Sequence, residues 1–181
     1  MKITPLKIPD VKLIEPDFFE DDRGYFFESF NQKNFNALVD LNAVFVQDNQ
    51  SKSNKGVIRG LHYQKKPFAQ AKLIYVISGK IFDVAVDVRR SSPTFGQQIN
   101  CILSADNKKQ LWIPEGFAHG FQALDPGTVI NYKVTNFYNK ESEGCLNFDD
   151  PFINIKWPLK PIFISDKDKK GLSLSEVGSM E

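Results

Sequence analysis

The sequence has few cysteines, few histidines and no excess of charge of either sign. Its two cysteines, Cys101 and Cys145, are too few and too far apart for a disulfide scaffold or a four-thiolate zinc site. We expect both to be buried small side chains in a reducing compartment. The 23 Lys and Arg residues nearly balance the 22 Asp and Glu residues, so that the net charge is +1. This balance excludes bulk attraction to nucleic acids or to membranes.

Long apolar runs, repeats and linkers are also missing. No stretch approaches the roughly 18 apolar residues that a membrane span requires, and the segment MKITPLKIPD lacks the apolar part of a secretion signal. No stretch rich in serine, glycine or proline marks a domain boundary. We therefore predict a single domain over residues 1–181, in the cytoplasm.

The residues that are abundant favour an all-β fold. The chain has 16 Phe, 10 Pro and 11 Gly, a mixture typical of many short strands joined by turns. We predict an early strand at residues 11–15 and one short helix beginning near Asn31, which would bury Phe35, Leu38 and Val39. After residue 149, three prolines favour an irregular arm with a short final helix.

The middle of the chain reads as strand after strand. The predicted strands cover residues 43–50, 56–64, 72–79, 80–89, 97–103, 110–114, 117–124 and 128–138. Two of them meet at Ser78 and Gly79. Alternation over residues 81–88 predicts a half-buried strand with Asp83 and Asp87 on a mostly polar outer face. Without helices to connect parallel strands, this order predicts a closed antiparallel barrel or jelly roll with a few short peripheral helices.

Four polar residues lie where a barrel needs apolar ones. His62 and His119 are each embedded in apolar, glycine-containing strands. A single buried histidine is as often a hydrogen-bonded core residue as a functional one, but two in a small barrel favour function. Lys72 and Tyr132 occupy the alternate positions of their strands at which the other residues are apolar and expected to face inward. The ordinary alternatives are a lysine that reaches water at a strand end and a tyrosine bonded to a backbone carbonyl.

Further polar side chains would gather at one barrel opening. Arg59 lies three residues from His62 and so on the opposite face, unless a bulge at Gly60 turns both to one side. Two other segments supply Phe19, Arg23, Glu28, Gln47, Asp48 and Asn49. Cations together with aromatic rings suit a diphosphate and a flat base.

The segment PEGFAH, residues 114–119, reproduces the PxGxxH stretch of the second cupin motif. Metal-binding cupins also present an HxH sequence in the first motif, where this chain has His62, Tyr63 and Gln64. A site of three imidazoles and a carboxylate cannot be built from two histidines. We therefore predict no metal site; a metal-dependent cupin dioxygenase or isomerase is the less favoured alternative.

Several stretches together resemble the dTDP-4-dehydrorhamnose 3,5-epimerase family. They are FEDDRGYFFESF, QDNQSKSNKGVIRGLHYQ, AKLIYVISGKIFDVAVDVRRSSPTFG, WIPEGFAHGFQAL and SDKD, and they extend over nearly the whole chain. The resemblance implies a cupin-type jelly roll that needs neither cofactor nor metal and forms a homodimer with residues shared across the interface. It implies inversion of C3 and C5 in dTDP-4-dehydro-6-deoxy-D-glucose.

The resemblance also implies roles for individual residues. The general base falls on His62, its carboxylate partner on Asp168, and the opposing acid on Tyr132; Asp166 leaves a one-residue uncertainty about the carboxylate. The substrate-contacting positions fall on Phe19, Arg23, Glu28, Gln47, Asp48, Asn49, Arg59, Lys72, His119, Tyr138, Glu143 and Lys167. Tyr138 would stack on the thymine, with Phe19 on its other side.

The chemistry explains why these residue types are needed. A 4-keto group acidifies the hydrogens at C3 and C5, and a neutral imidazole oriented by a carboxylate can remove them. Inversion requires an acid on the opposite face, for which Tyr132 is the candidate, and Lys72 can stabilise the enolate. Two alternatives stay open: epimerisation of only one carbon of another nucleotide-linked 4-ketosugar, and a non-catalytic sugar-nucleotide-binding barrel.

Overall fold

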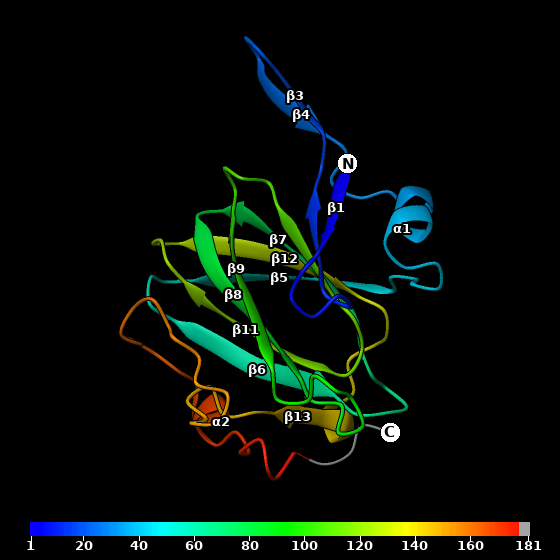
Figure 1. Cartoon of the computed structure of the whole chain (residues 1–181). Helices are drawn as coiled ribbons and strands as arrows, with labels where there is room; N and C mark the ends of the chain where they lie inside the picture. Colours follow the sequence, from blue (N-terminus) through cyan, green and yellow to red (C-terminus); the bar gives the residue numbers. More distant parts are fainter. Residues whose placement is uncertain (178–181) are drawn as a thin grey trace.

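Two antiparallel sheets face each other and form the body of the protein, as seen in Figure 1. The computed structural model describes residues 1–177, so the last four residues of the predicted domain lie outside it. The first sheet contains, in spatial order, β1 (Lys2–Pro5), β2 (Lys12–Glu15), β10 (Gln110–Ile113), β7 (Lys72–Ser78), β12 (Thr128–Val134) and β5 (Gln47–Ser53). The second contains β13 (Glu143–Cys145), β6 (Ile58–Gln64), β11 (Phe117–Ala123), β8 (Lys80–Asp87) and β9 (Gln98–Ser104). The all-β jelly-roll prediction is confirmed.

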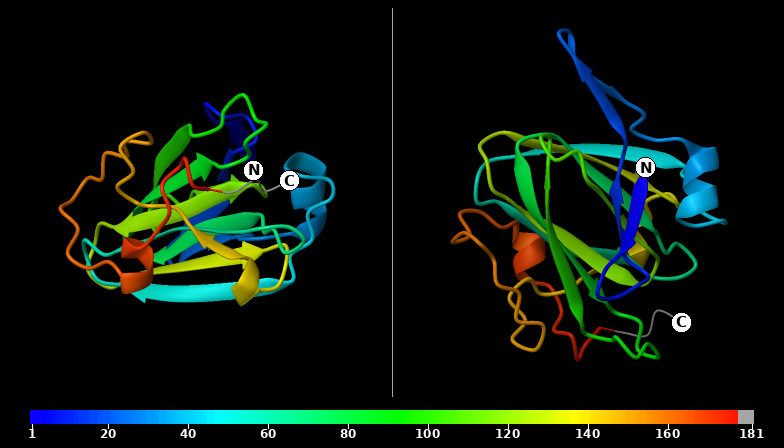
Figure 2. Two further views of the ribbon diagram at one scale, coloured as in Figure 1. Left: turned by 90° about the horizontal axis from the view of Figure 1, so that it is seen from below. Right: turned by 45° about the horizontal axis from the view of Figure 1, so that its top comes forward.

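The remaining elements are small and peripheral. The strands β3 (Phe18–Asp21) and β4 (Gly24–Phe27) form a separate hairpin, which projects from the body in Figure 1 and in the right-hand view of Figure 2. The helices are α1 (Gln32–Leu38), one 3-10 turn at Lys140–Ser142, and α2 (Asp166–Lys169). No helix within residues 1–177 is long and apolar enough to cross a membrane.

Alternating side chains from the two sheets fill the space between them. The main cluster includes Ile74 of β7, Ile130 of β12, Ala85 of β8 and Phe117 and Phe121 of β11. Because side chains alternate along a strand, Lys72, Tyr132 and His119 project into the same interior as these apolar neighbours. The barrel interior therefore holds the polar groups that the strand parity predicts.

Strands β7 and β8 differ in some details from the sequence predictions. The strands β7 and β8, predicted as a pair meeting at Ser78 and Gly79, belong to different sheets and do not pair. Strand β8 is buried on both faces, because the C-terminal arm covers the face of Val84, Val86 and Val88. Its supposed outer residues Asp83 and Asp87 are fully buried, so the prediction of a polar outer face was wrong.

Helix α1 begins where the sequence predicts. The side chain of Asn31 accepts a hydrogen bond from the backbone N–H of Asn34 and so caps the first turn. Phe35 and Val39 are buried against Trp112 and Leu73 on the outer face of the first sheet. Leu38 is 53% exposed, contrary to prediction.

The C-terminal arm packs on the outer face of the second sheet, and its helix α2 contacts strand β6. Bridges join Val57 to Phe163 and Leu146 to Leu172, and Ile153 and Ile155 add apolar cover. The Ser165 side chain caps α2 by accepting from the backbone N–H of Asp168. The arm thus places the Asp168 carboxylate beside β6.

A bulge at Gly60 decides which side chains of β6 face the interior. His62 pairs with His119, but Arg59 pairs with Phe121, so β6 contains one extra residue between these two pairs. Because His119 and Phe121 are two residues apart on β11, both point inward, and their partners His62 and Arg59 do so as well. The suggested bulge at Gly60 is confirmed.

Gly60 cannot accept a side chain in this bulge. It has φ of 121°, and an added Cβ would lie 2.6 Å from the Gly120 Cα and 2.7 Å from the His119 carbonyl oxygen. We expect Gly60→Ala to lower the free energy of unfolding by more than about 2 kcal/mol, as measured by urea denaturation. Gly127→Ala is the control, because φ there is 66° but the nearest atom lies 3.6 Å from the added Cβ. Equal effects of the two substitutions would refute this account of the bulge.

Candidate active site

His62 and Asp168 form a hydrogen-bonded pair at the edge of the barrel interior. The His62 Nε2–H donates to Asp168 Oδ1 at 2.7 Å, and the Gly60 backbone N–H donates to Oδ2 at 3.1 Å. Burial opposes ionisation of Asp168, but the bonds from His62 and Gly60 outweigh it and lower the pKa of this carboxyl. Asp166 is exposed and pairs with Lys169, so Asp168 is the tail carboxylate that contacts His62.

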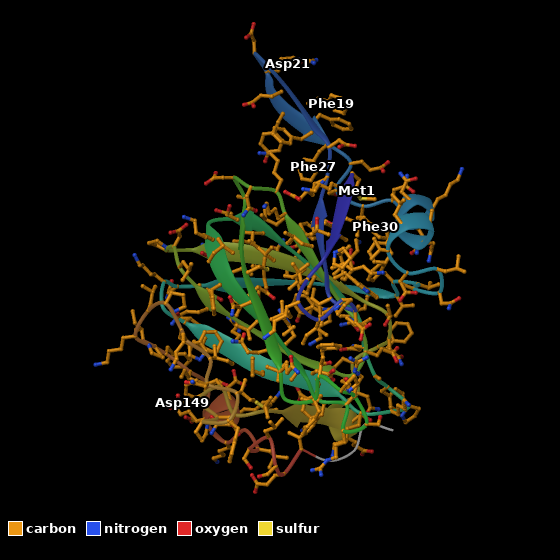
Figure 3. All side chains as sticks on the ribbon, viewed as in Figure 1. Met1, Phe19, Asp21, Phe27, Phe30 and Asp149 are labelled. Atoms are coloured by element: carbon orange, nitrogen blue, oxygen red, sulfur yellow. The ribbon has the colours of Figure 1, made fainter. Side chains whose placement is uncertain are left out.

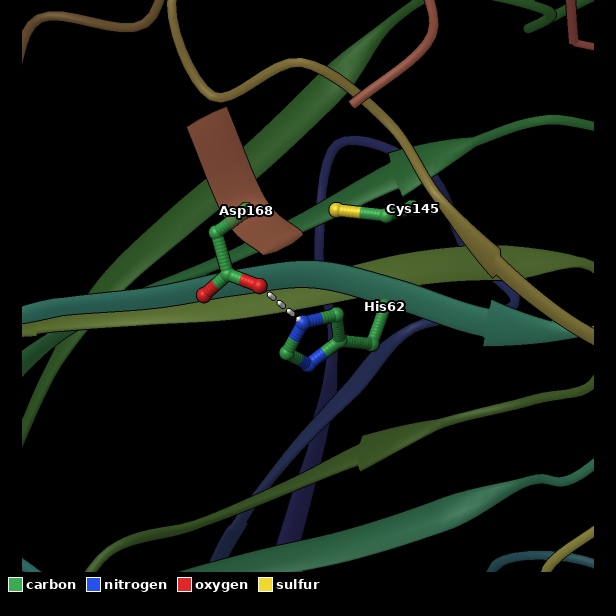
Figure 4. A group of neighbouring side chains, drawn as sticks. All are labelled: His62, Cys145 and Asp168. Atoms are coloured by element: carbon green, nitrogen blue, oxygen red, sulfur yellow. Dashed lines mark hydrogen bonds and ion pairs between the residues drawn. The ribbon is translucent and has the colours of Figure 1, made fainter. Parts of the chain in front are cut away.

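The geometry of the pair leaves one imidazole nitrogen free. In Figure 4 the second ring nitrogen of His62 points away from Asp168. A carboxylate that accepts from Nε2–H holds the neutral ring in the tautomer whose Nδ1 carries a lone pair. The free Nδ1 is therefore ready to accept a proton.

Cys145 lies beside this pair, a neighbour that the sequence did not reveal (Figure 4). One donor atom from each of His62, Cys145 and Asp168 lies within 4.8 Å of the others. Metal ligation needs a thiolate, but burial raises the pKa of Cys145 to about 11. Asp168 already accepts the bond from His62 Nε2, so the donor chemistry fits a hydrogen-bonded pair better than a metal centre. Both cysteines are free thiols and only half-buried, less than predicted.

A second histidine and carboxylate pair lies deeper in the interior. The His119 Nε2–H donates to Asp83 at 2.9 Å, and both residues are buried. Burial lowers the pKa of His119, and Asp83 opposes that shift. Asp83 was missed because its strand was read as half-exposed. The signal was present in the sequence: its same-face neighbours Ile81 and Ala85 are apolar.

Lys72 is a buried cation in the same interior. Its side chain amine donates to the His62 backbone carbonyl at 3.0 Å, and the residue is 7% exposed. Burial lowers the pKa of Lys72 to about 8, against the opposing charges of Asp83 and Glu143. The ordinary alternative, an amine that reaches water, does not describe this lysine.

Tyr132 approaches the interior from the opposite sheet. It packs against the central apolar cluster on β12, whereas His62 and His119 stand on β6 and β11 of the facing sheet. Burial raises the pKa of Tyr132 despite the nearby charge of Arg59, so its phenol keeps its proton at neutral pH. A proton acceptor and a proton donor thus stand on opposite walls of the interior.

Polar side chains near the pair form a partly exposed rim. Tyr138 donates its hydroxyl hydrogen to Glu143 at 3.1 Å, and Glu143 also forms an ion pair with Lys167. On β5, the Gln47 amide donates to Asn49 at 2.8 Å and accepts from the Tyr138 backbone N–H.

Asp48 is separated from these two amides. It pairs in register with Lys133, and its carboxylate binds the Lys133 amine on the face opposite to Tyr132. The alternation of β5 therefore turns it away from the interior.

The predicted residues nearer the N-terminus also lie elsewhere. Phe19 is 70% exposed on the projecting hairpin, and Arg23 at the hairpin turn pairs with Asp21 of its own hairpin. Glu28 accepts hydrogen bonds from Asn31 and Asn34 at the start of α1. Within one chain the structure does not bring these three residues to His62.

The remaining residues suit proton transfer at carbon. A free imidazole nitrogen can take a proton, a phenol on the opposite wall can return one, and a buried ammonium can stabilise the anion formed between these steps. Such a sequence of steps changes configuration without changing oxidation state.

Comparison with known proteins agrees with this chemistry. The profile of the dTDP-4-dehydrorhamnose 3,5-epimerase family matches residues 5–176. A curated protein of that name from Shigella flexneri is 54% identical over 171 residues, which is 94% of each chain. A Legionella pneumophila dTDP-6-deoxy-D-glucose-3,5-epimerase, crystallised with dTDP-4-keto-L-rhamnose, is 46% identical with a TM-score of 0.94, over 98% of this chain and 94% of that one.

A more distant relative has a narrower activity. A 3'-monoepimerase from Streptomyces bikiniensis, crystallised with dTDP-quinovose, is 30% identical with a TM-score of 0.88, over 94% of this chain and 87% of that one. The family profile and the Shigella relative both cover nearly all of this chain. The chain belongs to the dTDP-4-dehydrorhamnose 3,5-epimerase family.

Proposed function

We infer that this chain is an epimerase that inverts C3 and C5 of dTDP-4-dehydro-6-deoxy-D-glucose and yields dTDP-4-dehydro-L-rhamnose. A relative named for this activity is 54% identical over 94% of this chain. The observation that carries the proposal is the hydrogen bond between Asp168 and His62 of β6, with the half-buried phenol of Tyr132 on the facing sheet.

In the proposed mechanism, His62 Nδ1 removes the hydrogen from a carbon next to the ketone. The electrons of that C–H bond form the enolate, whose oxygen accepts a hydrogen bond from the Lys72 ammonium. Tyr132 then donates its proton to the opposite face of the same carbon, and Asp168 stabilises the imidazolium formed on His62. Exchange with solvent then removes the extra proton from His62 and returns a proton to Tyr132, and the steps repeat at the second carbon. The balance of atoms needs no redox cofactor.

Binding of the nucleotide would hold the sugar in place between base and acid. We assign the diphosphate to cations at the rim, Arg59 and Lys167, and the thymine to Tyr138, which is 56% exposed. His119, Glu143, Gln47 and Asn49 would contact the sugar or the nucleotide from the walls. Asp48 faces away from the interior and binds Lys133, so we assign it no contact with the substrate.

A second copy of the chain is needed to bring Phe19, Arg23 and Glu28 to an active site. The β3–β4 hairpin extends away from its own barrel with exposed aromatic side chains (Figure 3). We propose a homodimer in which the hairpin supplies Phe19 and Arg23 to the partner's site. Mixing Arg23→Ala with His62→Ala protein tests this, since shared sites predict that mixed dimers regain activity that neither variant has. We also propose one domain acting in the cytoplasm, which the two free thiols support.

Incubation of the wild-type protein with substrate in D2O tests the function. We expect deuterium at both C3 and C5 and a product of L-rhamno configuration, as detected by NMR. Label at C3 alone would favour the monoepimerase alternative. Binding of dTDP without exchange in a panel of 4-ketosugars would favour the non-catalytic barrel.

Lys72→Met tests the buried cation through activity and stability together. We expect turnover to fall about a hundred-fold, because the enolate loses its charged donor. In the folded protein the pKa of Lys72 is about 8, below its ordinary value of 10.5. Between pH 8 and pH 10.5 the unfolded chain therefore binds more protons than the folded protein, so the free energy of unfolding of the wild type increases as pH rises through this range. The variant lacks that gain, and at pH 7 we expect it to be more stable by up to about 3 kcal/mol.

Thermal unfolding at pH 7 and pH 10 measures the stability part of this prediction. The control is Lys52→Met, which replaces an exposed lysine on β5. A variant at position 72 that is less stable than this control at pH 7, or that turns over normally, would contradict the account.

A further inference from the structure

The β3–β4 hairpin is attached to the rest of the chain in an unusual way. Among residues 1–177, its two strands hydrogen-bond to each other and to no other strand. Figure 3 shows the labelled residues Phe19 and Asp21 well beyond the two large sheets. A two-stranded hairpin is marginally stable without further contacts, so something must fix its direction.

The register of the hairpin gives it two different faces. Phe18 pairs with Phe27 and Glu20 with Tyr25, so these four side chains share one face. Phe19 pairs with Phe26 on the other face, where both rings are at least 70% exposed. The residue proposed to serve the partner's site therefore lies on the second face.

The side chain of Lys108, which belongs to the barrel, contacts the first face of the hairpin. The Lys108 amine lies 4.7 Å from the centre of the Phe18 ring and 4.3 Å from that of Tyr25, one contact on each strand. Tyr25 also packs against Phe27, with ring centres 5.9 Å apart. An ammonium within about 6 Å of a ring centre is attracted by the ring face. Lys108 thus joins both strands of the hairpin to the barrel and leaves the Phe19 face open.

The backbone at Lys108 gives an independent indication. Lys108 lies in the turn between β9 and β10 with φ of 55°, a region where glycine and asparagine are favoured. The Asn107 side chain fixes this turn by accepting from the backbone N–H groups of Ser104 and Lys109. A lysine at this position is disfavoured by its backbone, and its ring contacts supply a reason for its presence.

We propose that Lys108 is a positioning residue that sets the direction of the β3–β4 hairpin, and thereby the placement of Phe19 and Arg23 for nucleotide binding. The inference rests on the proposed function, in which the hairpin completes the partner's site. Lys108 itself touches neither substrate nor reacting atoms; it acts through Phe18 and Tyr25.

The experiment compares Lys108→Gly and Lys108→Arg in the full-length protein. Glycine suits the left-handed turn and removes the cation, whereas arginine keeps the cation. We expect Lys108→Gly to raise KM by about five-fold or more, which corresponds to the loss of two cation–π contacts, with kcat changed less than about two-fold and Tm not lowered. Lys108→Arg should keep the wild-type KM. Lys109→Met is the matched control, because Lys109 follows Lys108 in the chain but pairs with Glu15.

A second measurement does not depend on activity. The ε-methylene protons of Lys108 lie over two rings, so we expect their NMR signals upfield of ordinary lysines in the wild type. An inactive wild type would remove the proposed function while these signals still report on the contact. An active wild type with ordinary lysine shifts, a wild-type KM in Lys108→Gly, or an equal rise in KM in Lys108→Arg would overturn the inference about Lys108.

Discussion

His62→Ala is expected to lose exchange and inversion at both C3 and C5. One imidazole serves as the base for both carbons in the proposed mechanism, and general bases contribute about a hundred- to ten-thousand-fold to rate. We expect turnover to fall by at least the upper part of this range, because the only other histidine, His119, donates its Nε2–H to Asp83 on a neighbouring strand. Proton NMR in D2O measures both carbons in one experiment.

Two controls separate loss of the base from loss of the site. The variant should still bind dTDP with near wild-type affinity, as measured by calorimetry, because the nucleotide contacts lie at the rim. Added imidazole should restore part of the activity by occupying the space of the missing ring. Exchange that continues at either carbon in His62→Ala would show that another group is the base there.

Tyr132→Phe should separate exchange from inversion. Without the phenol, the enolate can regain a deuteron only from the side of His62, so hydrogen is replaced by deuterium with retention of configuration. We expect inversion to fall about a thousand-fold, whereas exchange falls much less. The change removes one oxygen from a half-buried ring and leaves its packing on the central cluster in place.

The stereochemistry of the recovered sugar reports this result. Tyr75→Phe is a suitable control, since Tyr75 is a half-buried phenol on the neighbouring strand β7, at a register position next to that of Tyr132. If Tyr132→Phe inverts both centres as fast as Tyr75→Phe does, the phenol is not the acid.

Much of the fold and of the site follows from strand periodicity. The turn residues and alternating side chains predicted the strands from β5 to β12, with ends displaced by up to four residues at β5 and β12, and parity alone placed Lys72 and Tyr132 inside. These predictions succeed because an inward position on a strand is a local property, set by neighbours two residues away.

The features that strand periodicity could not decide depend on distant segments or on local backbone irregularity. Asp83 was assigned to an outer face although Ile81 and Ala85 on the same face are apolar, because the sequence does not show that residues 149–177 fold back over the other face of β8. The partnership of His62 with Asp168 joins residues 106 positions apart, and spacing could not choose between Asp166 and Asp168. The inward turn of Arg59 depends on a bulge that glycine permits but does not require.

The hairpin shows a further limit of sequence reading. Phe19 and Arg23 were grouped with His62 because their residue types suit a nucleotide and because the family resemblance implies substrate contacts for them, yet one chain keeps them apart. Their proposed place in a partner's site is a property of an assembly, which neither the periodicity nor the composition of a single chain contains.

A crystal structure with an unreactive dTDP-linked sugar tests the central claim most directly. We predict that the sugar ring lies between His62 and Tyr132, with Nδ1 within about 3.5 Å of one face at C3 or C5 and the phenol oxygen toward the opposite face. A ring bound in another cavity, or both side chains on the same face of it, would contradict the account.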